Sequence, residues 1–169
     1  MKKQIGIFGT ILGCIGLDQI TKRLAGSVLK GHEAIPVIRN IFELQYLENR
    51  GAAFGIFQNK QGMFVAMTVI VLAVLTYIYF QIPESGKYIP LKICYVLLTS
   101  GAVGNFIDRT MQGYVVDFFY FKWIDFPIFN VADIYVTFAM ILLLFFILFY
   151  YKEEDLDFIS RKGRHGKKD

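Results

Sequence analysis

Four apolar stretches decide what this chain can fold into. Residues 62–82, 88–108 and 131–151 each approach the roughly 20 residues that a helix needs to cross the hydrocarbon of a bilayer. Hydrophobic residues make up 55% of the sequence and charged residues only 19%. Their clustering into long runs favours a membrane protein over a soluble domain with a large core. The sequence therefore predicts one membrane-embedded domain over 1–169, mainly α-helical.

The first apolar stretch, residues 5–17, is too short to span by itself, because thirteen helical residues rise only about 20 Å. A spanning helix over about 4–26 must therefore continue through Asp18 and Lys22, which places both side chains near membrane depth. Four glycines, at positions 6, 9, 13 and 16, would permit close packing of this helix against another.

The N-terminus also has features of a signal peptide. Two lysines precede the apolar run, and the sequence from Ile11 to Cys14 resembles the cleavage site of a bacterial lipoprotein. However, the run before Cys14 is short, apolar sequence continues past the cysteine, and three further spans follow. An uncleaved first span is the favoured interpretation.

The distribution of lysine and arginine predicts the orientation. With four spans both termini share one side, and that side holds 10 of the 18 basic residues in short segments. The positive-inside rule then places both termini in the cytoplasm and the segments 23–61 and 108–130 outside. This topology accounts for the net charge of +4, so no nucleic-acid partner is expected. The charged tail, residues 152–169, is expected to be cytoplasmic and disordered.

The first outer segment is more than a linker. Residues 42–46 alternate apolar and polar side chains, which is the period of a strand, and Asn49-Arg50-Gly51 is typical of a turn. We expect a small β-rich cap over about 30–60 on the outer side, with residues 52–57 forming a surface loop or a half-inserted segment.

Polar side chains gather at the outer ends of the predicted spans. Ionisable groups at membrane depth are costly and therefore mark candidate functional sites. The candidates are Asp18, Lys22, Asn105, Asp108, Arg109, Asp117, Asn130 and Asp133.

Several of these candidates also have purely structural explanations. Asp18 and Lys22 are four residues apart on a helix, so they can form an ion pair that anchors the span end or can bind substrate. Asp108 and Arg109 are better explained as an interfacial anchor with an internal salt bridge. Gly101, on the same helix face as Asn105, and Gly104 would let another helix or a ligand approach.

Asn130 and Asp133 fit the N-cap and third position of a helix, which would explain both residues without catalysis. A cap does not explain Asp117, an acid within the apolar stretch 114–121. Two neighbouring aspartates cannot both ionise readily, so one can accept a proton from water while the other polarises a carbonyl. The two histidines, at positions 32 and 165, offer no serine–histidine pair, and the sequence has no metal-ligand pattern. The residues alone thus leave peptide hydrolysis by an aspartate pair as a hypothesis.

Five short motifs carry these polar residues in order along the chain. They are DQITK at 18–22, NRGAAFG at 49–55, GNFIDR at 104–109, VVDF at 115–118 and FNVAD at 129–133. Together they resemble the lipoprotein signal peptidase family, the type II signal peptidases of bacteria.

The resemblance implies a catalytic dyad of Asp117 and Asp133 and no cofactor or metal. It further implies supporting roles for Asp18, Lys22, Asn49, Gly101, Asn105, Asp108, Arg109, Asn130 and Ala132. The implied substrate is a prolipoprotein whose cysteine carries diacylglyceryl, cleaved just before that cysteine. The implied location is the bacterial cytoplasmic (inner) membrane, with the active site near the outer leaflet. We expect a monomer in contact with membrane lipids.

Two other classes of function compete with this interpretation. A small transporter would distribute polar residues through the membrane depth, whereas the spans at 62–82 and 131–151 are apolar through their centres. A non-catalytic membrane subunit would use its acid–base pairs only for helix packing, and a neutral isostere of Asp117 would then matter little.

Overall fold

The computed structural model describes residues 2–51 and 60–159, and this part of the chain is mainly helical. Its long helices are α1 (Lys2–Leu29), α2 (Gln61–Tyr79), α3 (Ile89–Gln112) and α4 (Val131–Phe149). All four are long and apolar enough to cross a membrane. The predicted class, a four-span α-helical membrane protein with a small β-rich cap, is confirmed.

The cap is a three-stranded antiparallel sheet in the order β1 (Ile35–Ile38), β2 (Phe42–Asn49) and β3 (Val115–Tyr120). The alternating residues 42–46 lie in β2, as the strand period predicts. The third strand comes from the connection between α3 and α4, outside the predicted cap of 30–60. It lacks the alternation of a half-exposed strand, because Val115, Val116, Asp117 and Phe118 are all buried.

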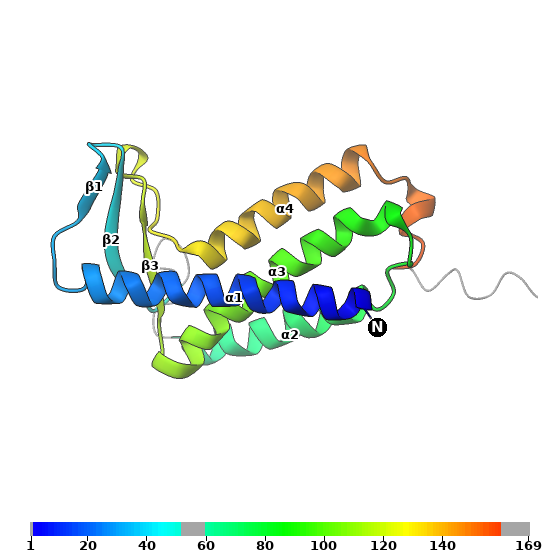
Figure 1. The fold of residues 1–169 in the computed structure, drawn as a ribbon, viewed down its shortest axis with the longest axis horizontal. Helices are drawn as coiled ribbons and strands as arrows, with labels where there is room; N and C mark the ends of the chain where they lie inside the picture. The colour runs from blue at the N-terminus through cyan, green and yellow to red at the C-terminus, as the bar shows by residue number, and fades with distance from the viewer. Residues whose placement is uncertain (1, 52–59, 160–169) are drawn as a thin grey trace, which may run out of the picture.

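The sheet lies at one end of the helices (Figure 1). α1 and α3 end there, whereas α2 and α4 begin there, and the N-terminus lies at the opposite end (Figure 1). Polar side chains at these four helix ends and on the adjoining strands can therefore meet in one place.

α3 packs closely on two neighbouring helices through glycines. A Cβ atom added to Gly101 would lie 2.5 Å from the carbonyl oxygen of Ala132 at the start of α4. One added to Gly104 would lie 2.5 Å from Asp18 Oδ2 on α1. The glycines at 6, 9, 13 and 16 were expected to allow close packing of α1 against another helix. They are not at such a contact, because a Cβ atom added at any of them would meet nothing within 4 Å. α1 instead packs against α3 further along, where Asp18 lies against Gly104.

The helix ends differ from the predicted spans by a few residues. α2 stops at Tyr79 rather than near 82, because Pro83 disfavours helical backbone just before it. α3 continues to Gln112 and ends at Gly113, whose φ of 76° suits glycine.

The far end of the helices carries a small apolar cluster of its own. Ile82, Leu91 and Tyr151 are buried together, and a short 3₁₀ helix, Glu153–Leu156, follows α4. Tyr151 donates a hydrogen bond to the carbonyl oxygen of Lys87 (2.9 Å), and Lys87 pairs with Asp155 (2.6 Å). The expectation of disorder from residue 152 onward is therefore wrong for 152–159, because aromatic and ionic contacts attach this segment to the α2–α3 connection.

Candidate active site

Asp117 is positioned by the alternation of β3. Val116 and Phe118 pack against Ala25 and Leu29 of α1 in a buried cluster. Since successive side chains in a strand point to opposite faces, Asp117 is directed away from this cluster. Its side chain is 1% exposed. It accepts hydrogen bonds from Asn49 Nδ2 (2.8 Å) and Asn130 Nδ2 (2.6 Å).

Asp133 lies in the first turn of α4 and completes a capping box. The Asn130 side chain accepts a hydrogen bond from the backbone N–H of Asp133 (3.0 Å), while Asp133 Oδ2 accepts one from the backbone N–H of Asn130 (3.1 Å). The predicted cap is thus confirmed. The cap leaves Asp133 Oδ1 available, and this atom accepts a hydrogen bond from Asn105 Nδ2 (2.8 Å).

Asn130 joins the two aspartates. Its side chain donates to Asp117 and its backbone donates to Asp133, so one residue fixes an oxygen of each carboxylate. The same Nδ2 also lies 3.2 Å from Asn105 Oδ1. Four donors from β2, α3 and the start of α4 therefore hold the pair at the sheet end of the helices.

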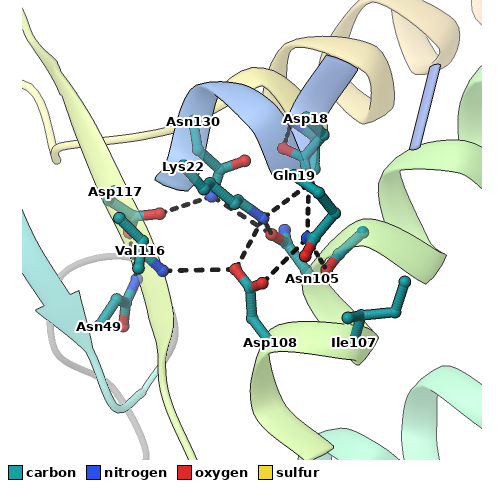
Figure 2. Close-up of polar contacts among 12 residues, drawn as sticks. Asp18, Gln19, Lys22, Asn49, Asn105, Ile107, Asp108, Val116, Asp117 and Asn130 are labelled. Carbon is teal, nitrogen blue, oxygen red and sulfur yellow. Dashed lines mark hydrogen bonds and ion pairs between the residues drawn. The ribbon is translucent and has the colours of Figure 1, made fainter. Parts of the chain in front are cut away.

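A buried ionic cluster lies beside Asp117 and Asn130 (Figure 2). Lys22 Nζ is 2.9 Å from Asp18 Oδ2, 2.9 Å from Asp108 Oδ2 and 2.8 Å from Asn105 Oδ1. Asp18 and Lys22 are 0% and 3% exposed. The predicted i, i+4 pair therefore forms, and it includes a second acid and an amide from α3.

Asp18 connects three helices. Its Oδ1 accepts a hydrogen bond from the backbone N–H of Ala132 in the first turn of α4 (2.9 Å), and its carboxylate lies against Gly104 of α3. A carboxylate at a helix N-terminus is stabilised by the unpaired N–H groups there. This contact places the start of α4, and hence Asp133, relative to α1.

Arg109 differs from expectation. Asp108 pairs with Lys22, and no ion pair joins it to Arg109 among the residues that the structure describes. Adjacent residues on a helix point in different directions, which separates the two side chains. The Arg109 guanidinium lies over the Phe64 ring of α2, 4.9 Å from its centroid. Within the same part of the chain, its buried Nε has no hydrogen-bond partner.

A cavity of about 680 Å³ opens beside the two aspartates. Its polar end is formed by Asn49, Arg109, Asp117 and Asp133. Its apolar remainder comes from the connection 121–129 and from one face of α4. Beyond Asp133, α4 contributes Ile134, Phe138 and Ile141 at helical spacing, together with Thr137. The cavity can therefore hold an elongated apolar group with one end at the carboxylates.

The surroundings of Asp117 make its protonated form much more stable than that of an ordinary aspartate. Burial away from water, followed by the charge of the Asp133 carboxylate, raises the pKa of Asp117 from 3.8 to about 7. The hydrogen bonds from Asn49 and Asn130 favour the ionised form and oppose this shift. A carboxyl group with such a pKa can hold or release a proton near neutral pH.

The candidate residues of the sequence analysis belong to this polar network or, like Gly101, pack against it, except Arg109, which lines the cavity. The predicted loop at 52–57 lies outside the described residues. The sequence analysis missed Gln19, whose side chain donates to Asp108 Oδ1 (2.9 Å) and contacts Asp18 (Figure 2). The available signal was a polar side chain at membrane depth directly after Asp18. It also missed the backbone N–H of Val116, which lies 3.4 Å from Asp108 Oδ2.

Comparisons with known proteins agree with this arrangement. The family model described as signal peptidase (SPase) II matches residues 10–149. The lipoprotein signal peptidase of Streptococcus thermophilus is 41% identical over 153 residues, covering 90% of this chain and 97% of the relative. That of Caldanaerobacter subterraneus is 46% identical over 128 residues, covering 75% and 85%, respectively. The structure of a bacterial membrane enzyme, solved in meso at 2.3 Å resolution, matches with a TM-score of 0.77 and 30% identity, covering 97% of this chain and 94% of that one.

Proposed function

The chain belongs to the signal peptidase II family, and from this premise we propose that Asp117 and Asp133 are its catalytic pair. Proteins of this family are aspartic-type proteases that cleave signal peptides from prolipoproteins, and this chain is such a peptidase. The observation that carries the assignment is the geometry at Asn130, which holds one oxygen of each aspartate at the polar end of an apolar cavity.

In the proposed reaction the pair shares one proton. The ionised carboxylate takes a proton from water, and the water oxygen attacks the scissile carbonyl carbon. The protonated carboxyl donates to the carbonyl oxygen. When the resulting tetrahedral diol collapses, one of its hydroxyls returns its proton to the ionised carboxylate, the C–N bond breaks and the leaving amine takes a proton from the protonated carboxyl. No covalent bond to the protein forms at any step.

The four hydrogen-bond donors to the pair hold the carboxylates in place for this chemistry. Asn49, Asn105 and Asn130 supply side-chain donors, and the Asn130 backbone supplies the fourth. Arg109 lines the cavity beside the pair, so its guanidinium is placed to bind a substrate carbonyl. Asp18, Lys22, Asp108, Gly101 and Ala132 position α1, α3 and α4 around the pair.

The proposed substrate is a prolipoprotein whose cysteine carries diacylglyceryl, cleaved just before that cysteine. The cavity is lined mainly by apolar side chains along α4 and by polar side chains around the pair, which suits an apolar segment that ends at the scissile bond. A diacylglyceryl group and a signal helix both reside in lipid, and a site at the membrane boundary can receive both while still reaching water. The sheet would lie over the bound segment at this end of the helices.

The chain is a multi-pass membrane protein, and we place it in the bacterial cytoplasmic membrane as a monomer surrounded by lipid. Both termini would be cytoplasmic and the sheet end would face outward, because the basic residues concentrate at the other end. A reporter active only outside the cytoplasm should be inactive when fused after residue 152 and active when inserted near Gly31. The reverse pattern would invert the orientation without affecting the catalytic assignment.

The decisive experiment uses Asp117→Asn and Asp133→Asn, incubated separately with diacylglyceryl-modified prolipoprotein. Both variants should fold and neither should cleave, because the pair then lacks the exchangeable proton. Asp125→Asn is the matched control, since Asp125 is exposed and its φ of 48° suits asparagine. Near-normal turnover by either site variant would remove that residue from the pair. Equal cleavage of an unlipidated substrate would refute the lipid requirement alone.

A further inference from the structure

Gln19 occupies a place in the polar cluster that the proposed mechanism does not use. Its Nε2 lies 2.9 Å from Asp108 Oδ1, 3.2 Å from the Gly104 carbonyl oxygen and 3.3 Å from Asp18 Oδ2. These contacts tie α1 to α3 on the side of the cluster away from Asp117 (Figure 2). Among the described residues Gln19 is not one of those that line the cavity, so any effect on the reaction must pass through its neighbours.

The ionic cluster contains two carboxylates, Asp18 and Asp108, but only one ammonium among the described residues, that of Lys22. Lys22 has three ammonium hydrogens, and three acceptors surround its Nζ: Asp18, Asp108 and the side-chain oxygen of Asn105. No ammonium hydrogen remains for the second oxygen of Asp108. In the part of the chain that the structure describes, Gln19 is the only donor to Asp108 Oδ1. The neutral amide thus completes a site with two carboxylates and one ammonium.

Loss of the Gln19 donor would leave a buried carboxylate oxygen without a partner, which is unfavourable. The nearest remedy is rotation of Asp108 toward Lys22, so that both carboxylate oxygens compete for the ammonium. Lys22 would then be drawn away from Asn105. The Asn105 amide is held through its oxygen by Lys22 and donates through its nitrogen to Asp133 Oδ1 (2.8 Å). A displaced Lys22 therefore releases the amide that orients Asp133.

We propose that Gln19 is a positioning residue for the peptidase reaction. The Gln19 amide donates to Asp108 and so leaves the Lys22 ammonium free to donate to Asn105 Oδ1. Lys22 in turn holds the Asn105 amide in the orientation that donates to Asp133. This inference rests on the proposed function, in which Asp133 is one of the two catalytic carboxylates.

The test compares Gln19→Met, which retains the side-chain length but has no donor, with Gln4→Met, the same substitution on an exposed turn of the same helix. Gln19→Met should lower kcat by roughly tenfold to a hundredfold, the scale of a small misplacement of a catalytic group. KM should stay within about twofold of the parent value, because the cavity is untouched. Gln4→Met should leave both constants unchanged. An unchanged kcat in Gln19→Met, or a loss expressed only in KM, overturns the proposal.

A double-mutant cycle identifies the route of the effect. In an Asn105→Ala background the amide is already gone, so adding Gln19→Met should lower the residual kcat by less than about twofold. A full, additive loss in that background overturns the proposed route through Asn105. If Gln19→Met does not fold, Gln19→Glu, which retains the shape but adds an acid, should show the same loss in kcat. Failure of both variants to yield folded protein assigns Gln19 a purely structural role and also overturns the proposal.

These outcomes are separable from failure of the proposed function. If Asp117→Asn or Asp133→Asn retains activity, the catalytic pair itself is wrong. If both are inactive while Gln19→Met has a normal kcat, only the positioning role of Gln19 is wrong.

Discussion

At the scale of single residues, Asp117 is defined by what surrounds it. It is buried in a strand, lies within the electrostatic influence of the Asp133 carboxylate and accepts two amide hydrogen bonds. The first two influences favour a bound proton and the last two favour the ionised form. The balance leaves a group whose protonation changes close to neutral pH, which is what proton transfer to and from a peptide requires.

The pH dependence of cleavage should reflect this balance. Burial and the Asp133 charge raise the pKa of Asp117 to about 7, so the pair holds its shared proton below that pH and loses it above. We expect kcat/KM to fall about tenfold per pH unit on the alkaline side of about 7. The apparent pKa of this profile belongs to the coupled pair rather than to one aspartate. The measurement is a pH–rate profile in detergent on lipidated substrate. A profile that is flat from pH 6 to 9 would contradict the shared proton.

Asn49→Ala should change the pH at which kcat/KM begins to fall on the alkaline side (the alkaline limb of the pH–rate profile). The Asn49 amide lowers the pKa of Asp117, so its removal should raise that pKa further and shift the limb to higher pH. The maximal kcat should also fall, by roughly tenfold, because one of two side-chain donors to Asp117 is lost. Asn40→Gly, at an exposed turn whose φ of 60° suits glycine, is the control for loss of an asparagine next to the same sheet. A limb that moves to lower pH would refute the assigned hydrogen bond.

At the scale of elements, the site depends on how closely α3 approaches α4. A Cβ added at Gly101 would come within 2.5 Å of the Ala132 carbonyl oxygen and 2.7 Å of Val136 Cγ2. The first of these is backbone and cannot rotate away. The spacing of the two helices at Asp133 is therefore set by the absence of a side chain at position 101.

Gly101→Ala should consequently destabilise the protein by about 1–3 kcal/mol, the usual cost of overpacking, and should lower activity by displacing Asp133. Gly9→Ala is the matched control, because it is also a helical glycine but its added methyl would meet nothing within 4 Å. Alanine favours helix over glycine, so Gly9→Ala should leave Tm equal or slightly raised. Thermal unfolding in detergent checks both, and equal Tm values for the two variants would contradict the close contact.

The elements differ in how far the sequence could predict them. Apolar length predicted the four helices, and alternation predicted the strand at 42–46. The strand at Val115–Tyr120 was not predicted, because it is buried on both faces and has no polar–apolar alternation. The partner of Asp108 was also mispredicted, since Lys22 is its partner only once α1 lies against α3. Likewise, the sequence placed Gln19 beside Asp18 but could not show that its amide reaches Asp108.

At the scale of the whole molecule, the two ends of the helix bundle have separate tasks. The sheet end holds the carboxylates, whereas the far end is closed by contacts between the α2–α3 connection and the segment after α4. The described contacts at the far end share no residues with those around the carboxylates. Substitutions at the far end should therefore change the stability of the protein but not the kcat or KM of cleavage.

Tyr151→Phe tests this separation. The variant loses the hydrogen bond to the Lys87 carbonyl while keeping the buried ring, so it should lose about 0.5–1.5 kcal/mol of stability. Its kcat and KM should equal those of the parent. Tyr150→Phe, at the exposed neighbouring residue, controls for the loss of a hydroxyl. A clear drop in kcat for Tyr151→Phe would show that the two ends are coupled.

The meeting of all four helix ends at the sheet has a consequence for synthesis. Lys22, Asn49 and Asn105 emerge from the ribosome first, but Asn130 and Asp133 belong to the start of the last helix. Until α4 enters the bilayer, Asp117 lacks both its partner acid and the residue that joins the two. With the proposed catalytic pair, a nascent chain therefore carries no working protease into the membrane, and proteolytic competence appears only when insertion is complete.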